Sequence, residues 1–316
     1  MIPSTTHTTA IMFILYTLIA VLFCLFLFDR LLPATAARWG LGLERWRSGL
    51  HCKTATLPGY SMPYLEGGKG EPLLLIHGFG GDKDNFTRMA RFLTPHYRVI
   101  CPDLPGFGEA SRDAQLSHSM QVQAARVGAF MDQLGLQRVH LGGNSMGGFI
   151  AAQLAAMHPE RVASLWLLDA AGTEAAHGSD ILAHYQATGD MPLLLQTESG
   201  FARLMKTTTH KAPFLPYSIK ITLARRAVAD FALHTRIMQE LTESPLLEQQ
   251  VGTLSTPALI VWGTEDRILS PAGAQAWHAL LPNSKVQMMP AIGHLPMLEA
   301  PRRTAQDYLD YRRSSS

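Results

Sequence analysis

The sequence has little of what marks several classes of protein. Cysteine occurs only three times in 316 residues, at Cys24, Cys52 and Cys101, and this spacing matches neither a metal site nor a disulfide framework. Charged residues make up only 16% of the chain and the net charge is +2, so the composition gives no reason to expect a nucleic-acid partner. No glycine-rich phosphate loop occurs, and no cluster of His, Cys and carboxylates has metal-ligand spacing. We therefore expect no metal and no cofactor.

Hydrophobic residues are abundant, and one run of them near the N-terminus contains no charge. Residues 10–28, AIMFILYTLIAVLFCLFLF, would form a helix about 28 Å long, close to the roughly 30 Å hydrocarbon core of a bilayer. We predict a tail over residues 1–9 and an uncleaved transmembrane helix over 10–28. The alternative is a cleaved signal peptide with its processing site at ATA, residues 34–36. Against it, no Lys or Arg precedes the run, and Asp29 and Arg30 separate the run from that site.

The next segment, residues 29–50, resembles a helix that lies at the membrane surface. Trp39, Leu43, Trp46 and Leu50 recur at the spacing of one helical face, and arginines flank that face. Tryptophan and arginine beside a membrane span are typical of the interface. The other interpretation is a linker helix packed on the globular domain.

The charges around the apolar run do not decide on which side of the membrane the globular part lies. Basic residues follow the apolar run but none precedes it, and the positive-inside rule would then place the globular part in the cytoplasm. Long domains cross membranes regardless of such counts, so the side stays open. Apolar helices of two chains can associate in the bilayer, which makes a homodimer through the N-terminal helix a further expectation.

From residue 51 onward, short apolar runs alternate with helical patterns, as in an α/β domain with a mostly parallel sheet. An antiparallel pair over 51–68 and six further runs predict eight strands; the six runs are residues 72–78, 97–103, 138–143, 164–170, 257–263 and 285–290. Helices are predicted over residues 85–93, 118–134, 146–157, 271–281 and 301–312. Residues 173–250 contain helical patterns but no strand, and we interpret them as a helical lid inserted between two parts of one core, 51–172 and 251–316.

The stretch HLGGNSMGGF, residues 140–149, surrounds one serine with glycines directly between a predicted strand and a predicted helix. Residues 143–147 fit the pattern G-x-S-x-G, in which a sharp, strained turn exposes the serine hydroxyl above the sheet. Gly143 and Gly147 are needed because a Cβ at either position would collide across the turn. Ser145 is thus the candidate nucleophile.

Three other strand ends supply the partners that a nucleophilic serine needs. Asp266 follows the strand PALIVWG, and His294 follows the last strand, which gives the chain order Ser, Asp, His. His294 would take the proton of Ser145, and Asp266 would hold the imidazole in the correct tautomer. The backbone amides of Phe79, in HGFGG, and of Met146 would form the oxyanion hole.

Other residues near these loops have plainer interpretations. Asp169 follows the sixth strand and is a rival to Asp266 as the acid, although Asp266 has the stronger sequence context. We expect His77 to hold the oxyanion loop through hydrogen bonds. DLPGFG, residues 103–108, and Glu299 are expected to order loops near the site.

Taken together, the motifs HGFGG, DLPGFG, GNSMGG, WGTEDRI and GHLPMLEAP resemble the α/β-hydrolase superfamily over about residues 55–315. The apolar run ahead of the core and HGFGGDKDNF are similar to membrane-anchored monoacylglycerol lipases and bacterial membrane-anchored phospholipases A. The resemblance implies an α/β-hydrolase fold and a single-pass protein of a bacterial inner membrane. It implies hydrolysis of acyl esters of glycerophospholipids, lysophospholipids or monoacylglycerols, with a membrane lipid or fatty-acyl substrate.

Two other functions are kept as alternatives. GNSMGG also occurs in soluble hydrolases that cleave carbon–carbon bonds, but those commonly carry a tryptophan after the catalytic histidine, where this chain has Leu295. A soluble hydrolase of C–C bonds or small esters would need the N-terminal run to be a cleaved leader. The second alternative is a lipid-binding module without catalysis, against which the complete Ser, Asp and His set argues. Ser145 itself excludes epoxide hydrolases and dehalogenases, which place an aspartate at this turn.

Overall fold

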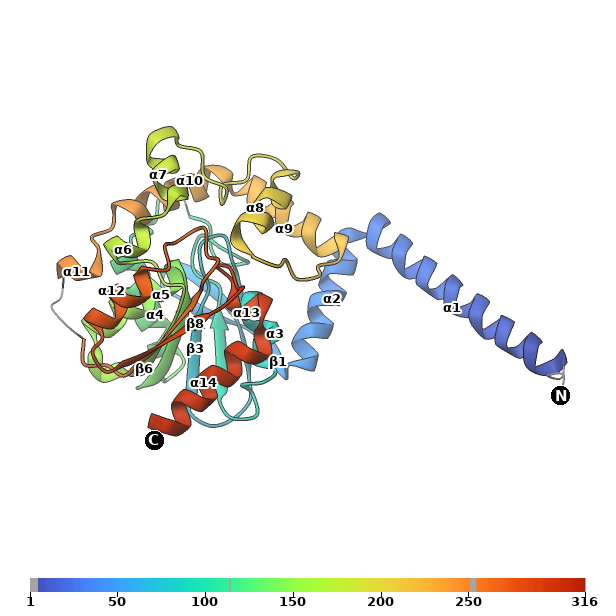
Figure 1. The fold of residues 1–316 in the computed structure, drawn as a ribbon, viewed down its shortest axis with the longest axis horizontal. Helices are drawn as coiled ribbons and strands as arrows, with labels where there is room; N and C mark the ends of the chain where they lie inside the picture. Colours follow the sequence, from blue (N-terminus) through green and yellow to red (C-terminus); the bar gives the residue numbers. More distant parts are fainter. Residues whose placement is uncertain (1–4, 114, 251–253, 316) are drawn as a thin grey trace.

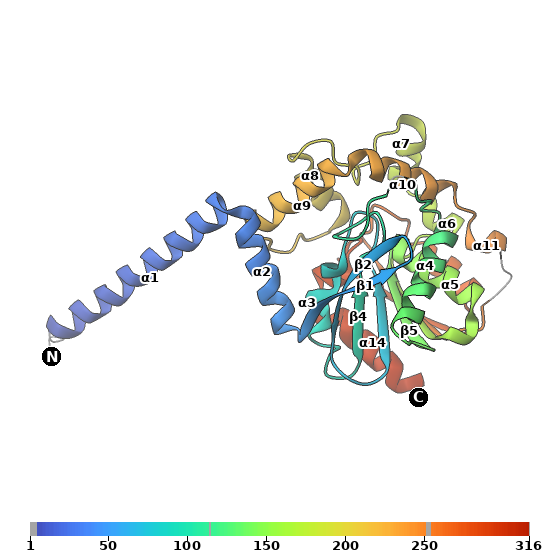
Figure 2. The same ribbon diagram turned by 180° about the vertical axis from the view of Figure 1, so that it is seen from behind.

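The computed structural model describes residues 5–113, 115–250 and 254–315. A long helix, α1 (Thr5–Leu31), projects from a globular body, and α2 (Pro33–Arg47) connects its base to that body (Figure 1). The body consists of one sheet with helices on both faces and a group of helices over one end of it (Figures 1 and 2).

The sheet has the eight strands that the apolar runs predict. They are β1 (Leu50–Leu57), β2 (Tyr60–Gly67), β3 (Pro72–Ile76), β4 (Arg98–Pro102), β5 (Val139–Asn144), β6 (Val162–Leu168), β7 (Ala258–Gly263) and β8 (Ser284–Met289). Their order is β1-β2-β4-β3-β5-β6-β7-β8. β1 pairs antiparallel with β2 and β2 with β4, whereas all pairs from β4 to β8 are parallel. The carboxyl ends of β3, β5, β7 and β8 therefore meet at one edge of the sheet, which is where an open α/β sheet places its site.

Helices bury both faces of the sheet. Leu74 and Ile76 of β3 belong to one apolar core, and the alternate residues Leu73 and Leu75 belong to the other, because successive strand residues point to opposite faces. The first core is covered by α4 (Met120–Gln133), α5 (Met146–Met157) and α12 (Gly273–Leu280). The second is covered by α3 (Thr87–Ala90), α13 (Pro296–Glu299) and α14 (Pro301–Ser315).

One predicted helix is much shorter than expected. The region 83–93 forms a 3-10 turn, η1 (Lys83–Phe86), followed by the single turn of α3. The residues after α3 form turns with bonds between residues three apart, such as Leu93 N–H to Ala90 O (2.8 Å). The turn is set by Asp82, whose side chain and that of Asn85 form a reciprocal capping box. This cap starts the helix two residues earlier than the apolar pattern indicated.

The segment between β6 and β7 contains six helices joined by loops, and no strand among its described residues. It contains α6 (Glu174–His177), α7 (Asp180–Thr188), α8 (Gly200–Thr208), α9 (Tyr217–Ala229), α10 (Phe231–Glu243) and α11 (Leu247–Gln250). In Figure 1, α7 to α10 lie together above the sheet. The predicted boundary between lid and core at 250/251 adjoins residues 251–253, which lie outside the described residues.

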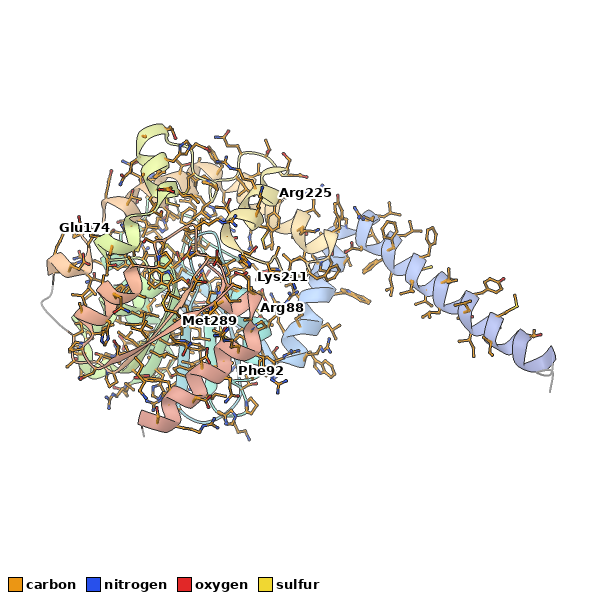
Figure 3. The ribbon with its side chains drawn as sticks, in the orientation of Figure 1. Arg88, Phe92, Glu174, Lys211, Arg225 and Met289 are labelled. Atoms are coloured by element: carbon orange, nitrogen blue, oxygen red, sulfur yellow. The ribbon has the colours of Figure 1, made fainter. Side chains whose placement is uncertain are left out.

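The N-terminal helix contains the whole predicted span and extends beyond it. It begins at Thr5, inside the predicted tail, and it continues through Asp29 and Arg30 to Leu31. The helix ends there because the next helix begins with Pro33, and proline disfavours helical geometry at the residue before it. The most apolar 18-residue window within residues 11–31 has a mean hydropathy of 2.9, and none of its residues is buried (Figure 3). By length and composition this one helix could cross a membrane.

The apolar face predicted over residues 29–50 is present in α2, but it includes three of the four predicted residues. Trp39, Leu43 and Trp46 of α2 are 70%, 53% and 76% exposed. Leu50 does not continue this face, because it begins β1 and is buried in the core. The apolar face of α2 is therefore turned away from the body and largely exposed, although the Trp39 ring packs edge-on against Phe28 of α1, with the ring centroids 5.8 Å apart.

The base of the N-terminal helix is attached to the lid. The Asp29 carboxylate accepts a hydrogen bond from the Ser218 N–H at 3.1 Å, in the first turn of α9, where a negative charge is favourable. The Arg30 guanidinium lies over the Tyr217 ring, 4.3 Å from its centroid. The two charges that follow the predicted span thus fix it to α9.

Candidate active site

Ser145 occupies the sharp turn that the glycine pattern predicts. It joins β5 to α5 with φ 55° and ψ −121°, a conformation that non-glycine residues rarely adopt. The strain is held by backbone bonds on both sides: Ser145 N–H donates to Leu168 O (3.0 Å), and Ser145 O accepts from Gly148 N–H (3.0 Å) and Ala171 N–H (3.1 Å). Ser145 is buried from bulk solvent and lines a cavity.

The two glycines of the motif are required by close backbone approach. A Cβ on Gly143 would lie 2.2 Å from Gly147 O, and a Cβ on Gly147 would lie 2.2 Å from Ile76 O. Both contacts are to backbone atoms, which cannot move without displacing β3 or α5. The sharp turn therefore depends on the absence of side chains at these positions.

The structure pairs His294 with Asp266. His294 Nδ1 lies 2.7 Å from Asp266 Oδ2, and both side chains are buried. The other oxygen, Asp266 Oδ1, accepts hydrogen bonds from the N–H groups of Ile268 (2.8 Å) and Leu269 (3.1 Å). Because the carboxylate accepts from Nδ1, the histidine proton lies on Nδ1 and leaves Nε2 as the basic nitrogen. No hydrogen bond joins Ser145 to His294 among the described residues, although both line the same cavity.

Asn144 connects the serine turn to the histidine loop, a role that the sequence did not reveal. Its side-chain N–H2 donates to Leu168 O and to His294 O, each at 3.0 Å. The histidine loop is also held from the lid, because the His294 N–H donates to Thr208 O at 2.9 Å. The position of His294 thus depends on the core and on α8.

The loop HGFGG passes directly beside Ser145. A Cβ on Gly78 would lie 3.2 Å from the Ser145 Cβ and 3.1 Å from Asn144 Oδ1, so a side chain here would push these neighbours by a few tenths of an ångström. The N–H groups of Phe79 and of Met146, the first residue of α5, donate to no described backbone carbonyl. Such free amides at a loop and a helix start are suited to bind an oxyanion.

His77 holds this loop as the sequence predicted. Its Nε2 accepts a hydrogen bond from Leu104 N–H at 3.1 Å, so Nδ1 carries the proton and donates to Gly78 O at 2.8 Å. Complete burial lowers the pKa of His77, which keeps the ring neutral. The ring thereby joins the HGFGG loop to the segment 103–108.

Buried ion pairs reinforce the same region. Lys83 Nζ lies 2.9 Å from carboxylate oxygens of both Asp103 and Glu109, and Lys83 N–H donates to Asp103 at 2.7 Å. Asp82 pairs with Arg226 of α9. Burial of Asp82 would favour the neutral acid, but the positive charge of Arg226 and its hydrogen bond lower the pKa of Asp82 to about 2. The lid is therefore bound electrostatically to the loop that carries Phe79.

Glu299 makes a second connection between lid and core. Its Oε2 accepts from the N–H groups of His210 (2.9 Å) and Lys211 (2.8 Å), and its Oε1 accepts from Gly293 N–H at 2.9 Å. Burial raises the pKa of Glu299 although these donors oppose the shift. Glu299 thus orders the loop before His294, as expected from the sequence.

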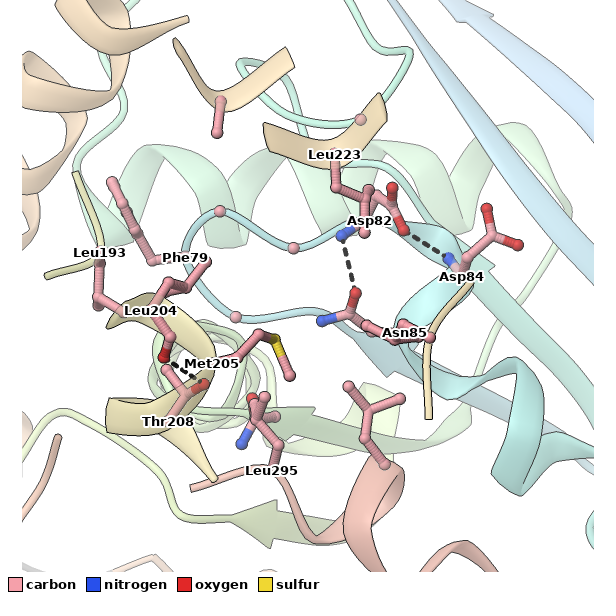
Figure 4. A pocket seen from close by; sticks show the side chains of 18 of the residues that line it. Phe79, Asp82, Asp84, Asn85, Leu193, Leu204, Met205, Thr208, Leu223 and Leu295 are labelled. Atoms are coloured by element: carbon pink, nitrogen blue, oxygen red, sulfur yellow. Dashed lines mark hydrogen bonds between the residues drawn. The ribbon is translucent and has the colours of Figure 1, made fainter. Parts of the chain in front are cut away.

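A cavity of about 180 Å³ separates the strand ends from the lid (Figure 4). Ser145, His294 and Phe79 lie on its core side. The lid side is apolar and consists mainly of α8 and α9 residues, namely Phe201, Leu204, Met205, Ile219, Leu223 and Ala227. At one end the cavity reaches Leu41 and Glu44 of α2, the helix next to the N-terminal anchor candidate. Helical periodicity alone did not separate these lid residues from ordinary core contacts.

Asp169, the rival acid, also lies at this edge of the sheet. One of its carboxyl oxygens, one of Asp266 and a ring nitrogen of His294 all lie within 4.8 Å of one another. Asp169 is not bonded to His294; its Oδ1 accepts from Gly263 N–H at 2.8 Å. These three residues are the one group of metal-binding side-chain types found together among the described residues, and Asp266 and His294 already bond each other.

Comparison with known proteins places this chain in a family. The family model for the alpha/beta hydrolase fold matches residues 71–301, so the chain belongs to the α/β-hydrolase family. It is 38% identical over 275 residues to Lipase 3 of a Moraxella species, covering 85% of this chain and 87% of that one. It is 26% identical over 250 residues to monoacylglycerol lipase ABHD6 of Homo sapiens, with coverages of 76% and 74%.

A solved structure extends the likeness to nearly the whole chain. The crystal structure of a membrane phospholipase A, described as a bacterial virulence factor, matches with a TM-score of 0.86 at 38% identity. The match covers 97% of this chain and 98% of that one, so it includes the N-terminal helices. The protein is thus a hydrolase of the α/β family, related to enzymes that cleave lipid esters.

Proposed function

We propose that the protein is a membrane-anchored serine hydrolase that cleaves acyl esters of glycerophospholipids, lysophospholipids or monoacylglycerols. The observation that carries this proposal is the combination of Ser145 with the bonded Asp266–His294 pair at the floor of an apolar cavity. The relation to lipases and to a membrane phospholipase A supports the same substrate class.

The first half of the reaction forms an acyl-enzyme. The Ser145 hydroxyl turns toward His294 and attacks the ester carbonyl while Nε2 takes its proton. The Asp266 carboxylate stabilises the resulting imidazolium, and the Phe79 and Met146 amides stabilise the oxyanion. The alcohol leaves with the proton from His294. Water then attacks the acyl-enzyme by the same steps and releases the fatty acid.

The cavity explains why the substrate would carry an acyl chain. Leu204, Met205 and Leu223 form an apolar wall opposite Ser145, and burial of each methylene group against such a wall contributes about 0.8 kcal/mol. The polar alcohol part of a lipid would instead lie among the charged side chains near Asp82 and Arg226, which also line the cavity.

The N-terminal helices suit a substrate that resides in a bilayer. We propose that α1 spans the membrane once and that the exposed Trp39, Leu43 and Trp46 of α2 lie in its interface. The cavity reaches α2 at Leu41 and Glu44, so a lipid leaving the bilayer would have a short path to Ser145. Two such anchors could pair in the bilayer, and we propose a homodimer formed through α1.

A fluorophosphonate probe and a membrane extraction test the two parts of this proposal separately. Labelling of the full chain in detergent should disappear in Ser145→Ala and persist in Ser164→Ala, which changes a serine remote from the cavity. Labelling that survives in Ser145→Ala would refute the proposed nucleophile. After alkaline carbonate washing the chain should remain in the membrane pellet at its full mass. Release into the supernatant, or loss of residues 1–36, would revive the soluble hydrolase with a cleaved leader.

A further inference from the structure

Asp169 is fixed to the end of the strand that leads to Asp266. It follows β6 with a φ of 46°, and its backbone N–H donates to Val261 O at 2.9 Å. Its Oδ1 accepts from Gly263 N–H at 2.8 Å. Both bonds go to β7, so Asp169 and Asp266 are held on the same short segment of structure.

The two carboxyl groups differ in their partners. Both oxygens of Asp266 are occupied, one by His294 and one by two backbone N–H groups. The Oδ2 of Asp169 is completely buried and has no hydrogen-bond partner among the described residues. Yet Asp169, Asp266 and His294 bring ligand atoms within 4.8 Å of one another. A buried polar oxygen without a partner beside a triad is a costly arrangement, and it needs an explanation.

The charges explain how the arrangement is tolerated. Two carboxylates this close in a buried site repel each other strongly, so one of them retains its proton. Burial raises the pKa of Asp169 well above its usual range, and the Asp266 charge, a side-chain hydrogen bond that the protonated Asp169 shares with Asp266, and Glu299 act in the same direction, whereas the bond from Gly263 opposes the shift. The donors around Asp266 stabilise its charge. The proton therefore resides on Asp169, which presents a neutral acid to the Asp266–His294 pair.

We propose that Asp169 is a reserve acid beside the triad: it remains neutral next to the Asp266 carboxylate, and it orients His294 only when that carboxylate is removed. The inference rests on the proposed serine hydrolysis, because the reserve role has meaning only beside that triad. In the unmodified enzyme the proton of Asp169 is not transferred, and only the Ser145 proton moves, to Nε2. When Asp266 is replaced by asparagine, the repulsion disappears, Asp169 loses its proton to water, and its carboxylate becomes the acceptor for Nδ1–H.

A double-mutant cycle tests this assignment on the full chain in detergent micelles. The variants are Asp169→Asn, Asp266→Asn and the double variant, with kcat and KM measured for one monoacylglycerol from pH 5 to pH 10. Asparagine tolerates positive φ as aspartate does, so Asp169→Asn should fold. Asp169→Gly, which also accepts this φ, is a second way to remove the carboxyl group. Thermal unfolding of each variant verifies that it is folded.

The cycle is expected to be strongly non-additive. Asp169→Asn keeps a neutral group of the same shape, and its kcat should stay within about threefold of wild type. Removal of a triad aspartate usually lowers kcat by about 10⁴-fold. Here Asp266→Asn should lose only about 10²-fold because Asp169 replaces it, and the double variant should lose at least a further tenfold. The activity of Asp266→Asn should rise with pH as Asp169 ionises, and this rise should be missing from the double variant.

The outcomes separate this inference from the proposed function. If Asp266→Asn and the double variant are equally inactive and share one pH profile, Asp169 cannot replace Asp266 and the inference is wrong. If Asp169→Asn or a folded Asp169→Gly alone is as damaging as Asp266→Asn, Asp169 is not a neutral partner. A wild-type enzyme without Ser145-dependent hydrolysis of any monoacylglycerol, lysophospholipid or diacyl phospholipid would instead refute the proposed function.

Discussion

The two walls of the cavity are built in different ways. The core wall consists of backbone atoms in conformations that are costly or that leave no room for side chains. Ser145 has a positive φ, and Gly143 and Gly147 lie so close to neighbouring backbone atoms that a Cβ would clash with them. The lid wall is made of apolar side chains such as Leu204 and Met205, and polar bonds such as the Arg226–Asp82 pair and those from the His210 and Lys211 N–H groups to Glu299 join the lid to the core. The comparison teaches that the backbone of the proposed nucleophile is fixed by its neighbours, whereas the shape offered to the proposed substrate is set by replaceable side chains.

The largest effect on stability is expected from a substitution in the core wall. Gly147→Ala would place a Cβ 2.2 Å from Ile76 O, and no side chain can move to relieve the clash. We expect a loss of unfolding free energy of more than about 4 kcal/mol, or no folded protein. Gly128→Ala in α4 is the matched control, because the nearest atom to its Cβ is Leu154 Cδ1 at 3.6 Å. It should gain about 0.5–1 kcal/mol in thermal or urea unfolding. Equal stability of the two variants would contradict the assigned role of the close approach.

The next largest effect concerns the ion pair between Arg226 of the lid and Asp82 of the core. Arg226→Met leaves the buried Asp82 carboxylate unpaired and should cost about 2–4 kcal/mol of unfolding free energy at pH 7. Arg225→Met, one residue away and paired on the surface with Glu198, should cost less than about 0.5 kcal/mol. A similar cost for both variants would show that the Arg226–Asp82 pair does not hold the lid to the core.

The same pair makes stability depend on pH. The pKa of Asp82 is about 2 in the folded protein, below its ordinary 3.8. Its contribution is therefore complete above about pH 4 and is lost as the pH falls toward 2. The cost of Arg226→Met should shrink over this window in urea unfolding, because the orphaned carboxylate can then be protonated. A cost that is constant from pH 6 to pH 3 would contradict the ion pair as its source.

The smallest effect sharpens the comparison, because it changes the lid wall alone. Leu204→Trp fills part of the cavity opposite Ser145 and should shift the preference toward short acyl chains by about tenfold in kcat/KM. Leu204→Met, which conserves volume, should leave the preference unchanged. Fluorophosphonate labelling of Ser145 should stay equally fast in both variants. Slower labelling in Leu204→Trp alone would mean that the lid wall also positions the reacting groups.

The same contrast explains what could be predicted from the sequence. The eight strands and the Ser145 turn were predictable, because strand periodicity and glycine spacing record local geometry directly. The pairing of His294 with Asp266 rather than Asp169 followed from loop context, and the structure places Asp266 on His294. Asn144 was missed because its bonds reach 24 and 150 residues along the chain, which no local pattern reports.

The errors arose where caps and tertiary contacts decide. The helix expected over 85–93 is replaced by a capped 3-10 turn, since Asp82 and Asn85 bond each other's backbone. Leu50 fits the helical face of Trp39 and Trp46 by spacing, but it is buried as the first residue of β1. The lid residues that line the cavity could not be separated from core residues, because both are apolar at helical spacing.

The measurement that tests the central claim most directly is fatty-acid release by wild type and Ser145→Ala in detergent micelles. The substrates are monoacylglycerols, lysophospholipids, diacyl phospholipids and short p-nitrophenyl esters. The account predicts release from at least one lipid class by the wild type alone, with long-chain lipids preferred over short esters. Release from diacyl phospholipid would identify a phospholipase A, and release from single-chain lipids only would identify a monoacylglycerol lipase or lysophospholipase. Turnover of short esters without any lipid, or lipid turnover that persists in Ser145→Ala, would contradict the account.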